Sequence, residues 1–276
     1  MKTAMTRWLM KMLPDDAACR LMMSQIGRTS EVALVADEAA AMSSATALRF
    51  GANGEHAAFA WGSGPLVILV HGWNGRAAQM APLATALAAQ GYKCVAPDIT
   101  GNGAPGLRAT RWHYFLRDIE ALTKALATDV FAFIGHSSGG TTMMAARRHG
   151  LIGAERYICI SSPADPFLSI DSAEERFAPR TAVMNRYKDS IADEFRMTWD
   201  DLAAGGSYAG AGKELLLVYA KKDRMVPHSE GDRVHALCRG SSLVKLEGYG
   251  HRSVLSAPEL SSEAIRFLRP GRSSKS

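Results

Sequence analysis

The pentapeptide Gly135-His136-Ser137-Ser138-Gly139 places a serine between two glycines. An apolar run precedes it at residues 130–134 and a helical pattern follows, so we expect Ser137 on a sharp turn between a strand and a helix. The backbone of such a turn is strained and leaves little room for neighbours, a demand that small residues meet. A serine held in this way can act as a nucleophile. Because the pentapeptide pattern also recurs by chance, the neighbouring segments decide whether Ser137 is interpreted as one.

Three further segments supply polar groups, each after a predicted strand. An apolar strand at residues 66–70 runs into His71-Gly72-Trp73-Asn74-Gly75, where backbone N–H groups could face a developing negative charge. Asp223 follows the predicted strand at residues 215–220, and His251 follows a shorter one at residues 243–246. The first segment is therefore a candidate oxyanion loop, and the positions of Asp223 and His251 suit the acid and the base of a triad.

Other histidines and aspartates compete for these roles. His136 adjoins the serine on the turn, where its side chain points elsewhere, and we interpret it as a packing or pocket-wall residue. We interpret His71 as a structural member of the oxyanion loop. Asp98 also follows a predicted strand, but it precedes Ser137 in the chain, whereas the acid of a triad in the order serine, acid, histidine follows the serine. The remaining candidates fall on a predicted exposed helix: His228, Asp232 and His235.

The order serine, aspartate, histidine, each after a different strand, resembles that of the α/β-hydrolase superfamily, in particular its serine esterase, lipase and thioesterase-like members. The resemblance covers most of the chain, from about residue 66 to the C-terminal helix. Its motifs are His71-Gly72-Trp73, Asp98-Ile99-Thr100-Gly101-Asn102-Gly103, the pentapeptide around Ser137, the Asp223 loop and Gly250-His251.

This resemblance implies a role for each motif. Ser137 would be the nucleophile, His251 the base and Asp223 the carboxylate that orients it. The oxyanion N–H groups would come from Trp73 and Ser138. One departure is Asn102, which stands where the family usually carries an aromatic residue, histidine or arginine, and it implies an altered pocket rim.

Strands and helices alternate along most of the chain. A hairpin that turns near Asn53-Gly54 leads into this pattern. The predicted strands lie at residues 66–70, 93–97, 130–134, 157–160, 215–220 and 243–246, and the predicted helices near residues 77–89, 112–127 and 141–149. The alternation predicts an α/β fold, here the α/β-hydrolase fold, with a mostly parallel central sheet, helices on both faces and a site at the carboxyl ends of the strands.

Three segments lie outside this alternation: residues 1–47, 164–212 and 269–276. We expect the first to be an N-terminal helical extension and the last a flexible tail, on either side of a hydrolase domain at residues 48–268. Residues 164–212 interrupt the domain and close on a glycine-rich hinge at residues 205–212. In the resembled family an insertion here is a helical cap over the active site. Its aromatics either face the active site or fill the cap's own core: Phe167, Phe177, Tyr187, Phe195 and Trp199.

Composition excludes several classes of protein. The chain of 276 residues, 47% of them hydrophobic, is long enough to bury the core of one large α/β domain. Its net charge of +5 is dispersed without a Lys/Arg tract, so we expect no nucleic-acid partner. The four cysteines lack the spacing of metal ligands, so we expect buried free thiols and no metal or other cofactor.

The N-terminus predicts a short cationic amphipathic helix. It has apolar residues at helical spacing and basic residues on its other sides: Met5, Trp8, Leu9, Met12 and Leu13 against Lys2, Arg7 and Lys11. It lacks the apolar core of a secretory signal, and no segment is long enough for a membrane span, so we expect a cytoplasmic protein. This helix could pack on the body, fray or lie on a membrane surface. We favour packing or fraying.

Taken together, these features predict a cofactor-independent serine hydrolase. It would cleave carboxylic esters or thioesters with small to medium acyl groups through an acyl-enzyme on Ser137. One alternative keeps the triad for acyl transfer or for a lyase reaction, and another is a non-catalytic ligand-binding protein on the same fold. The resemblance also implies that this chain is neither a haloalkane dehalogenase nor an epoxide hydrolase, because those members of the superfamily need an aspartate at the position of Ser137.

Overall fold

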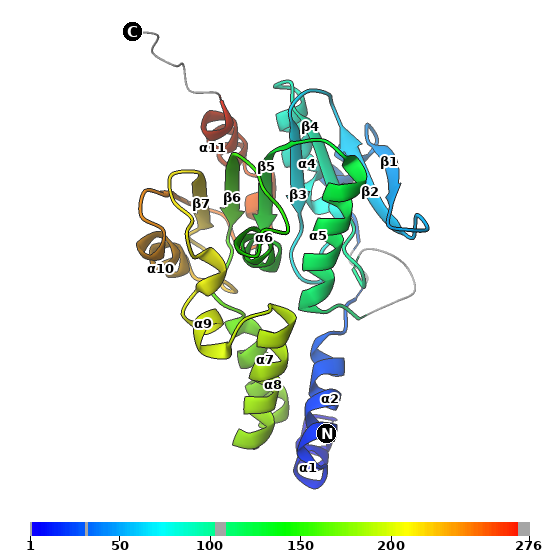
Figure 1. Ribbon diagram of the computed structural model, residues 1–276, viewed down its shortest axis with the longest axis vertical. Coiled ribbons are helices and arrows are strands. Elements are labelled where there is room, and N and C mark those ends of the chain that lie inside the picture. Colours follow the sequence, from blue (N-terminus) through cyan, green and yellow to red (C-terminus); the bar gives the residue numbers. More distant parts are fainter. Residues whose placement is uncertain (1, 31–32, 103–108, 270–276) are drawn as a thin grey trace.

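The computed structural model of the protein describes residues 2–30, 33–102 and 109–269, with side chains from Met5 onward. Within this part of the chain, eight strands form one sheet in the order β1-β2-β4-β3-β5-β6-β7-β8 (Figure 1). The strands are β1 (Thr46–Phe50), β2 (His56–Trp61), β3 (Leu66–Val70), β4 (Lys93–Pro97), β5 (Val130–His136), β6 (Arg156–Ile160), β7 (Leu215–Ala220) and β8 (Ser242–Leu246).

The sheet is mostly parallel. β1 and β2 form the expected antiparallel hairpin, and β2 pairs antiparallel with β4, while every pair from β4 across to β8 is parallel. All five residues of β3, with the sequence LVILV, are buried, as are all six of β7. Continuous apolar runs of this kind are typical of central parallel strands that have helices on both faces.

Helices cover both faces of the sheet. On one face lie α5 (Trp112–Leu126), α6 (Ser138–Arg148) and α10 (Ser229–Leu237). They pack on the sheet through an apolar core that includes Phe115, Met143 and Val234. On the other face lie α4 (Ala77–Ala88) and α11 (Pro258–Leu268). The shorter elements are α3 (Ala36–Met42), α9 (Trp199–Ala203) and the 3₁₀ turns η1 (Gly206–Tyr208) and η2 (Ser253–Ser256).

Four helices form a narrower lobe below the sheet in Figure 1: α1 (Lys2–Met12), α2 (Asp15–Ile26), α7 (Phe167–Phe177) and α8 (Thr181–Glu194). This helical lobe has its own apolar core, to which the N-terminal helices contribute Met10 and Met22. The cap aromatics Phe177, Tyr187 and Phe195 are buried in the same core, so they pack inside the lobe. The N-terminal helices and the cap helices are therefore one packing unit.

Several predicted boundaries differ from the structure. α6 begins at Ser138, earlier than the helix expected from residue 141. β1 begins at Thr46, two residues before the predicted start of the hydrolase domain at residue 48. The glycine-rich segment expected to be a hinge contains η1, whose Tyr208 is buried and donates a hydrogen bond to the Pro163 carbonyl at 3.1 Å. It is therefore anchored at its centre by a large buried side chain. In the tail expected at residues 269–276, residues 270–276 lie outside the described residues.

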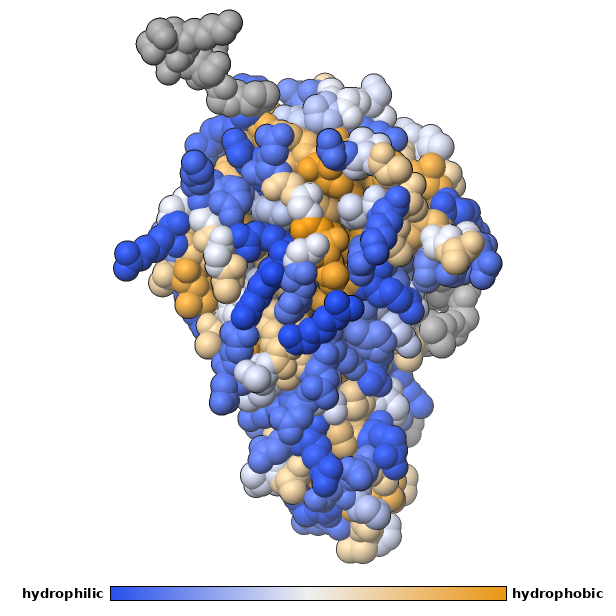
Figure 2. Space-filling view, viewed as in Figure 1, coloured by the Kyte–Doolittle hydropathy of each residue, from blue (hydrophilic) through white to orange (hydrophobic). Residues whose placement is uncertain are grey.

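The surface is polar over most of the face seen in Figure 2, on the sheet-containing body and on the helical lobe alike, with hydrophobic residues in smaller areas between. Among the described residues, no helix is long and apolar enough to cross a membrane.

Candidate active site

Ser137 occupies the predicted sharp turn between β5 and α6. Its φ is 53°, a left-handed conformation that is rare for a residue with a side chain. A Cβ atom at Gly135 would lie 2.5 Å from the Gly140 Cα, and one at Gly139 would lie 2.3 Å from the His71 carbonyl oxygen. The two glycines are therefore required by close packing against α6 and against the loop after β3. A hydrogen bond of 2.9 Å from the Ser137 N–H to the Ile160 carbonyl fixes the turn to β6.

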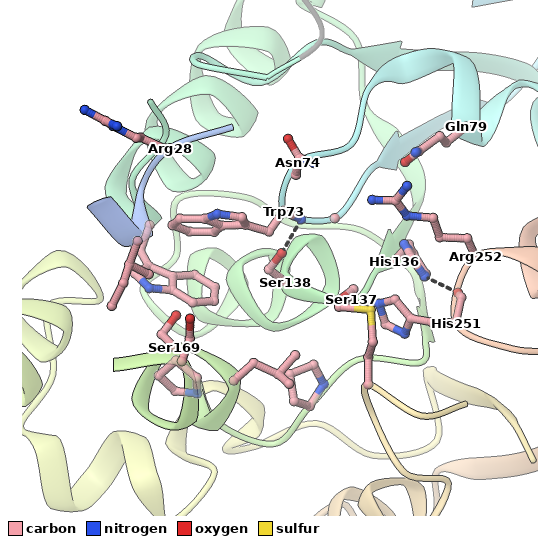
Figure 3. A pocket seen from close by; sticks show the side chains of 18 residues that line it. Arg28, Trp73, Asn74, Gln79, His136, Ser137, Ser138, Ser169, His251 and Arg252 are labelled. Atoms are coloured by element: carbon pink, nitrogen blue, oxygen red, sulfur yellow. Dashed lines mark hydrogen bonds between the residues drawn. The ribbon is translucent and has the colours of Figure 1, made fainter. Parts of the chain in front are cut away.

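Ser137, His251 and Asp223 form a continuous chain of hydrogen bonds. The Ser137 Oγ lies 3.0 Å from the His251 Nε2, and the His251 Nδ1 lies 2.7 Å from the Asp223 Oδ2. An ionised carboxylate only accepts hydrogen bonds, so Nδ1 carries a proton and Nε2 of the neutral ring accepts one from the serine hydroxyl. Figure 3 shows His251 beside Ser137 at one end of the pocket. The arrangement can move a proton from the serine to the imidazole.

Asp223 lies in a tight turn directly after β7. Its Oδ1 accepts hydrogen bonds from the N–H groups of Met225 at 2.8 Å and Val226 at 2.9 Å. Burial by itself would raise the pKa of Asp223, but the hydrogen bond and charge of His251 and these two N–H groups outweigh it and lower the pKa. The carboxylate is therefore held ionised and in one orientation opposite the imidazole.

His136 braces the other side of His251. Its Nε2 donates a hydrogen bond of 2.8 Å to the His251 carbonyl oxygen, and the two rings lie 4.7 Å apart between centroids. Burial, with repulsion by His251, lowers the pKa of His136 to about 3. Its Nδ1 is buried without a hydrogen-bond partner among the described residues. His136 was predicted to be a packing or pocket-wall residue. In the structure it also fixes the backbone of His251 through this hydrogen bond.

His71 and Asp98 hold loops in place, away from the hydrogen-bonded chain at Ser137. The buried His71 donates from Nδ1 to the Gly72 carbonyl at 2.7 Å and accepts at Nε2 from the Ile99 N–H at 3.1 Å. Burial lowers the pKa of His71, so the ring stays neutral. The Asp98 Oδ1 accepts from the Ala77 N–H at 2.7 Å, at the first residue of α4. The loop after β3 is therefore fixed at both its ends.

Two backbone N–H groups lie beside Ser137. A Cβ atom at Gly72 would lie 2.9 Å from the Ser137 Cβ, so this loop abuts the serine. The Trp73 N–H donates to the Ser138 Oγ at 2.6 Å (Figure 3). Ser138 is the first residue of α6, so its own N–H has no acceptor within the helix and the positive end of the helix dipole points here. The pair can stabilise a negatively charged oxygen.

Asn102 is buried behind the loop after β3, at 3% exposure, and is not among the residues that line the pocket. The expectation that it alters the pocket rim is therefore wrong. Its Oδ1 accepts from the Asn74 N–H at 2.9 Å, and its Nδ2 donates to the Thr110 Oγ1 at 2.9 Å. A short amide side chain can make both hydrogen bonds in this space. Asn102 thus supports the loop that carries the Trp73 N–H.

Asn74 and Ser30 are positioning residues that the sequence analysis missed. The Asn74 Oδ1 accepts from the Ser30 N–H at 2.6 Å, and its Nδ2 donates to the Ser30 Oγ at 3.1 Å. Asn74 has a φ of 56°, which asparagine tolerates better than most residues. The Asn74-Gly75 dipeptide is a turn signal, but nothing local reveals a partner 44 residues earlier. The N-terminal segment is thereby tied to the loop.

A pocket of about 380 Å³ opens beside Ser137 (Figure 3). Its volume falls within the range of small-molecule sites. Apolar walls come from three parts of the chain, namely Ile26 at the end of α2, Trp73 and Trp112 on the body, and Leu168 of α7. Arginines also line it: Arg28 and Arg252. The N-terminal extension therefore forms part of the pocket, a role that its sequence did not predict.

The cysteines and other metal-binding residue types do not form a site in the described residues. All four cysteines are buried free thiols, as expected from their wide spacing and from the apolar runs around Cys94 and Cys159. No group of three or more His, Cys, Asp or Glu side chains within the described ranges could hold a metal ion.

The family follows from a comparison with known proteins. Residues 67–264 match the model of the Alpha/beta hydrolase family. The chain belongs to the alpha/beta hydrolase family. The predicted fold and the resemblance on which it was based are thereby confirmed, and the matched residues include the turn at Ser137 and the loops of Trp73, Asp223 and His251.

Solved structures of other alpha/beta hydrolases superpose on this one. A membrane phospholipase A described as a bacterial virulence factor is 16% identical, with a TM-score of 0.61 over 84% of this chain and 87% of that one. An esterase from Thermogutta terrifontis is 18% identical (TM-score 0.55, 80% and 97%), and an epoxide hydrolase from Vigna radiata 15% identical (0.59, 82% and 98%). At such identities the likeness shows the fold. No curated protein matches this alpha/beta hydrolase significantly.

Proposed function

We propose that this alpha/beta hydrolase is a serine hydrolase that cleaves carboxylic esters or thioesters through an acyl-enzyme on Ser137. The observation that carries the proposal is the chain of hydrogen bonds from Ser137 through His251 to Asp223, which lies at a pocket with both apolar and polar walls. A neutral serine is a weak nucleophile, and an adjacent base that is itself oriented by a carboxylate supplies the activation it needs.

In the first half of the reaction, the Ser137 Oγ attacks the carbonyl carbon while its proton passes to the His251 Nε2. Asp223 stabilises the imidazolium without taking the proton. The carbonyl oxygen becomes an oxyanion that accepts from the N–H groups of Trp73 and Ser138, a contribution of about 3 kcal/mol per donor in comparable sites. Since the Trp73 N–H donates to the Ser138 Oγ in the free protein, the substrate oxygen must displace that hydroxyl.

The tetrahedral intermediate collapses when His251 returns the proton to the leaving alcohol or thiol, and Ser137 keeps the acyl group. Water then attacks the acyl-enzyme, with His251 again as the base, and releases the carboxylic acid and free Ser137. A pocket of about 380 Å³ suits small to medium acyl groups. The same residues would serve acyl transfer if an alcohol or amine replaced the water.

The proposal is tested with a fluorophosphonate probe, which labels activated serines, and with p-nitrophenyl esters of graded acyl length. We expect the label to map to Ser137 and the Ser137→Ala variant to lose labelling and turnover while remaining folded. Ser262→Ala, at an exposed serine of α11, is the matched control and should behave as the wild type. Undiminished turnover by Ser137→Ala would overturn the assignment. Product analysis with added alcohols and thiols separates hydrolysis from transfer.

A further inference from the structure

Helix α1 turns its most apolar stripe away from the protein. Met5, Trp8, Leu9 and Met12 are 68%, 59%, 38% and 63% exposed. Their spacing places all four on one side of the helix. The opposite side contributes Met10, which is 1% exposed and lies in the core of the helical lobe. Amphipathic helices of globular proteins normally show the reverse orientation, because the apolar side faces the core.

This orientation is fixed by contacts with the cap. The guanidinium of Arg180 donates hydrogen bonds to the carbonyl oxygens of Met10 and Lys11, at 3.2 and 2.8 Å, and to that of Leu13 at 2.8 Å. Met10 and Lys11 belong to the last turn of α1, whose carbonyls have no partner within the helix, and Leu13 directly follows that helix. Arg7 also donates to the carbonyl oxygen of Glu175 on α7. The helix is therefore tied to the lobe along its inner side, and the exposed stripe cannot be buried there without breaking these bonds.

The charges on α1 are all positive. Its sequence contains Lys2, Arg7 and Lys11 and no acidic residue, and Arg7 and Lys11 are exposed. By helical geometry, Lys11 lies along the border of the apolar stripe. The first acidic residues, at the start of α2, are occupied: Asp15 pairs with Arg180 at 2.6 Å and Asp16 with Arg186 at 2.7 Å. With Lys11 at the border of the stripe and no acidic side chain in α1, an anionic surface complements the exposed side of this helix.

We propose that α1 docks the protein on an anionic lipid bilayer surface. The helix would lie in the plane of the interface, with Met5, Trp8, Leu9 and Met12 among the headgroups and upper acyl chains and Lys11 at the lipid phosphates. Tryptophan favours this depth because its ring is apolar and its N–H is polar. The exposed stripe lies along a single helix, which suits insertion into the surface of a bilayer. This docking is independent of the chemistry at Ser137.

Binding is measured by vesicle flotation with the full chain carrying Ser137→Ala, so that no lipid is hydrolysed. The vesicles are phosphatidylcholine alone or phosphatidylcholine with phosphatidylglycerol. We expect the protein to float with the phosphatidylglycerol vesicles, less with phosphatidylcholine, and less at high salt, because exposed charges are screened. Trp8→Ser with Met12→Ser should weaken binding by at least about tenfold, since the loss of two apolar anchors removes buried area from the interface.

Leu237→Ser is the matched control, because Leu237 is an apolar residue of α10 with 49% exposure, and it should bind as the parent does. Thermal unfolding confirms that the variants fold. The proposal is overturned if the parent protein ignores phosphatidylglycerol vesicles, or if the double variant floats equally well. A dimer that the double variant abolishes, without any lipid binding, would also overturn it and would assign the stripe to a second copy of the chain.

Discussion

His251 is held at two separate points, by one group on its ring and by another on its backbone. Asp223 fixes the ring through Nδ1, and His136 fixes the main chain through the carbonyl oxygen. The two groups owe their charge states to opposite causes: Asp223 stays ionised because its hydrogen bonds and the charge of His251 outweigh burial, and His136 stays neutral because it is buried. In the proposed reaction both constraints matter, because a small shift of the imidazole breaks its contact with the serine.

Asp223→Asn tests the ring constraint. The amide can donate to Nδ1 and so favours the tautomer with the proton on Nε2, which no longer accepts from Ser137. We expect kcat for p-nitrophenyl acetate to fall on the order of 10⁴-fold with the fold intact. The control is Asp232→Asn, at an exposed aspartate that pairs with Lys245 on the surface. If Asp223→Asn retains most of the wild-type rate, another group orients His251.

The elements could be predicted from the sequence where the signal is local. The five apolar residues of β3 and the six of β7 predicted the bounds of both strands correctly. Ser137, Asp223 and His251 each follow a predicted strand, β5, β7 and β8, and were named as candidates for that reason. The support of the loop after β3 could not be predicted, because Ser30, Asn74 and Asn102 are ordinary loop residues whose pairing depends on the folded chain. The same holds for α1, where the periodicity predicted an amphipathic helix but not which side faces outward.

Asn74→Gly tests whether the N-terminal segment positions this loop. Glycine accepts the left-handed backbone at residue 74 and keeps the N–H that donates to Asn102, so the only hydrogen bonds removed are those to Ser30. We expect kcat to fall about tenfold with a smaller change in KM, because a misplaced Trp73 N–H weakens transition-state binding. Asn53→Gly, at an exposed turn position between β1 and β2, should leave the rate unchanged. Equal rates for all three proteins would show that the tether has no part in turnover.

At the scale of the whole molecule, segments far apart in the sequence together build the helical lobe and the pocket. The N-terminal helices and the cap, separated by most of the sheet, pack as one lobe and together wall the pocket. The body in turn buries His71 and His136 at the carboxyl ends of its strands, with both rings neutral. These buried bases make the stability of the fold depend on pH, since each must lose its hydration to fold and regains it only on unfolding.

His136 sets the sign of this dependence. Its pKa is about 3 in the folded protein against an ordinary value of 6.5, so below about pH 6.5 the unfolded chain binds a proton that the folded chain does not. Stability therefore falls as the pH drops through that window, and His136 alone should remove about 2 kcal/mol of unfolding free energy between about pH 7 and about pH 5. His71 acts in the same direction, while Asp223, whose pKa is lowered from 3.8, adds its loss only at more acidic pH.

Urea unfolding of the wild type and of His136→Gln at these two pH values measures the effect. Glutamine can still donate to the His251 carbonyl but does not titrate, so we expect its loss of unfolding free energy on acidification to be smaller by about 2 kcal/mol. His235→Gln, at an exposed histidine of α10, should lose as much as the wild type. Equal losses in all three proteins would mean that the ring of His136 takes up its proton within the folded structure. In that case the brace on His251 would itself be charged in acid, and the serine, imidazole and carboxylate would no longer have a neutral neighbour.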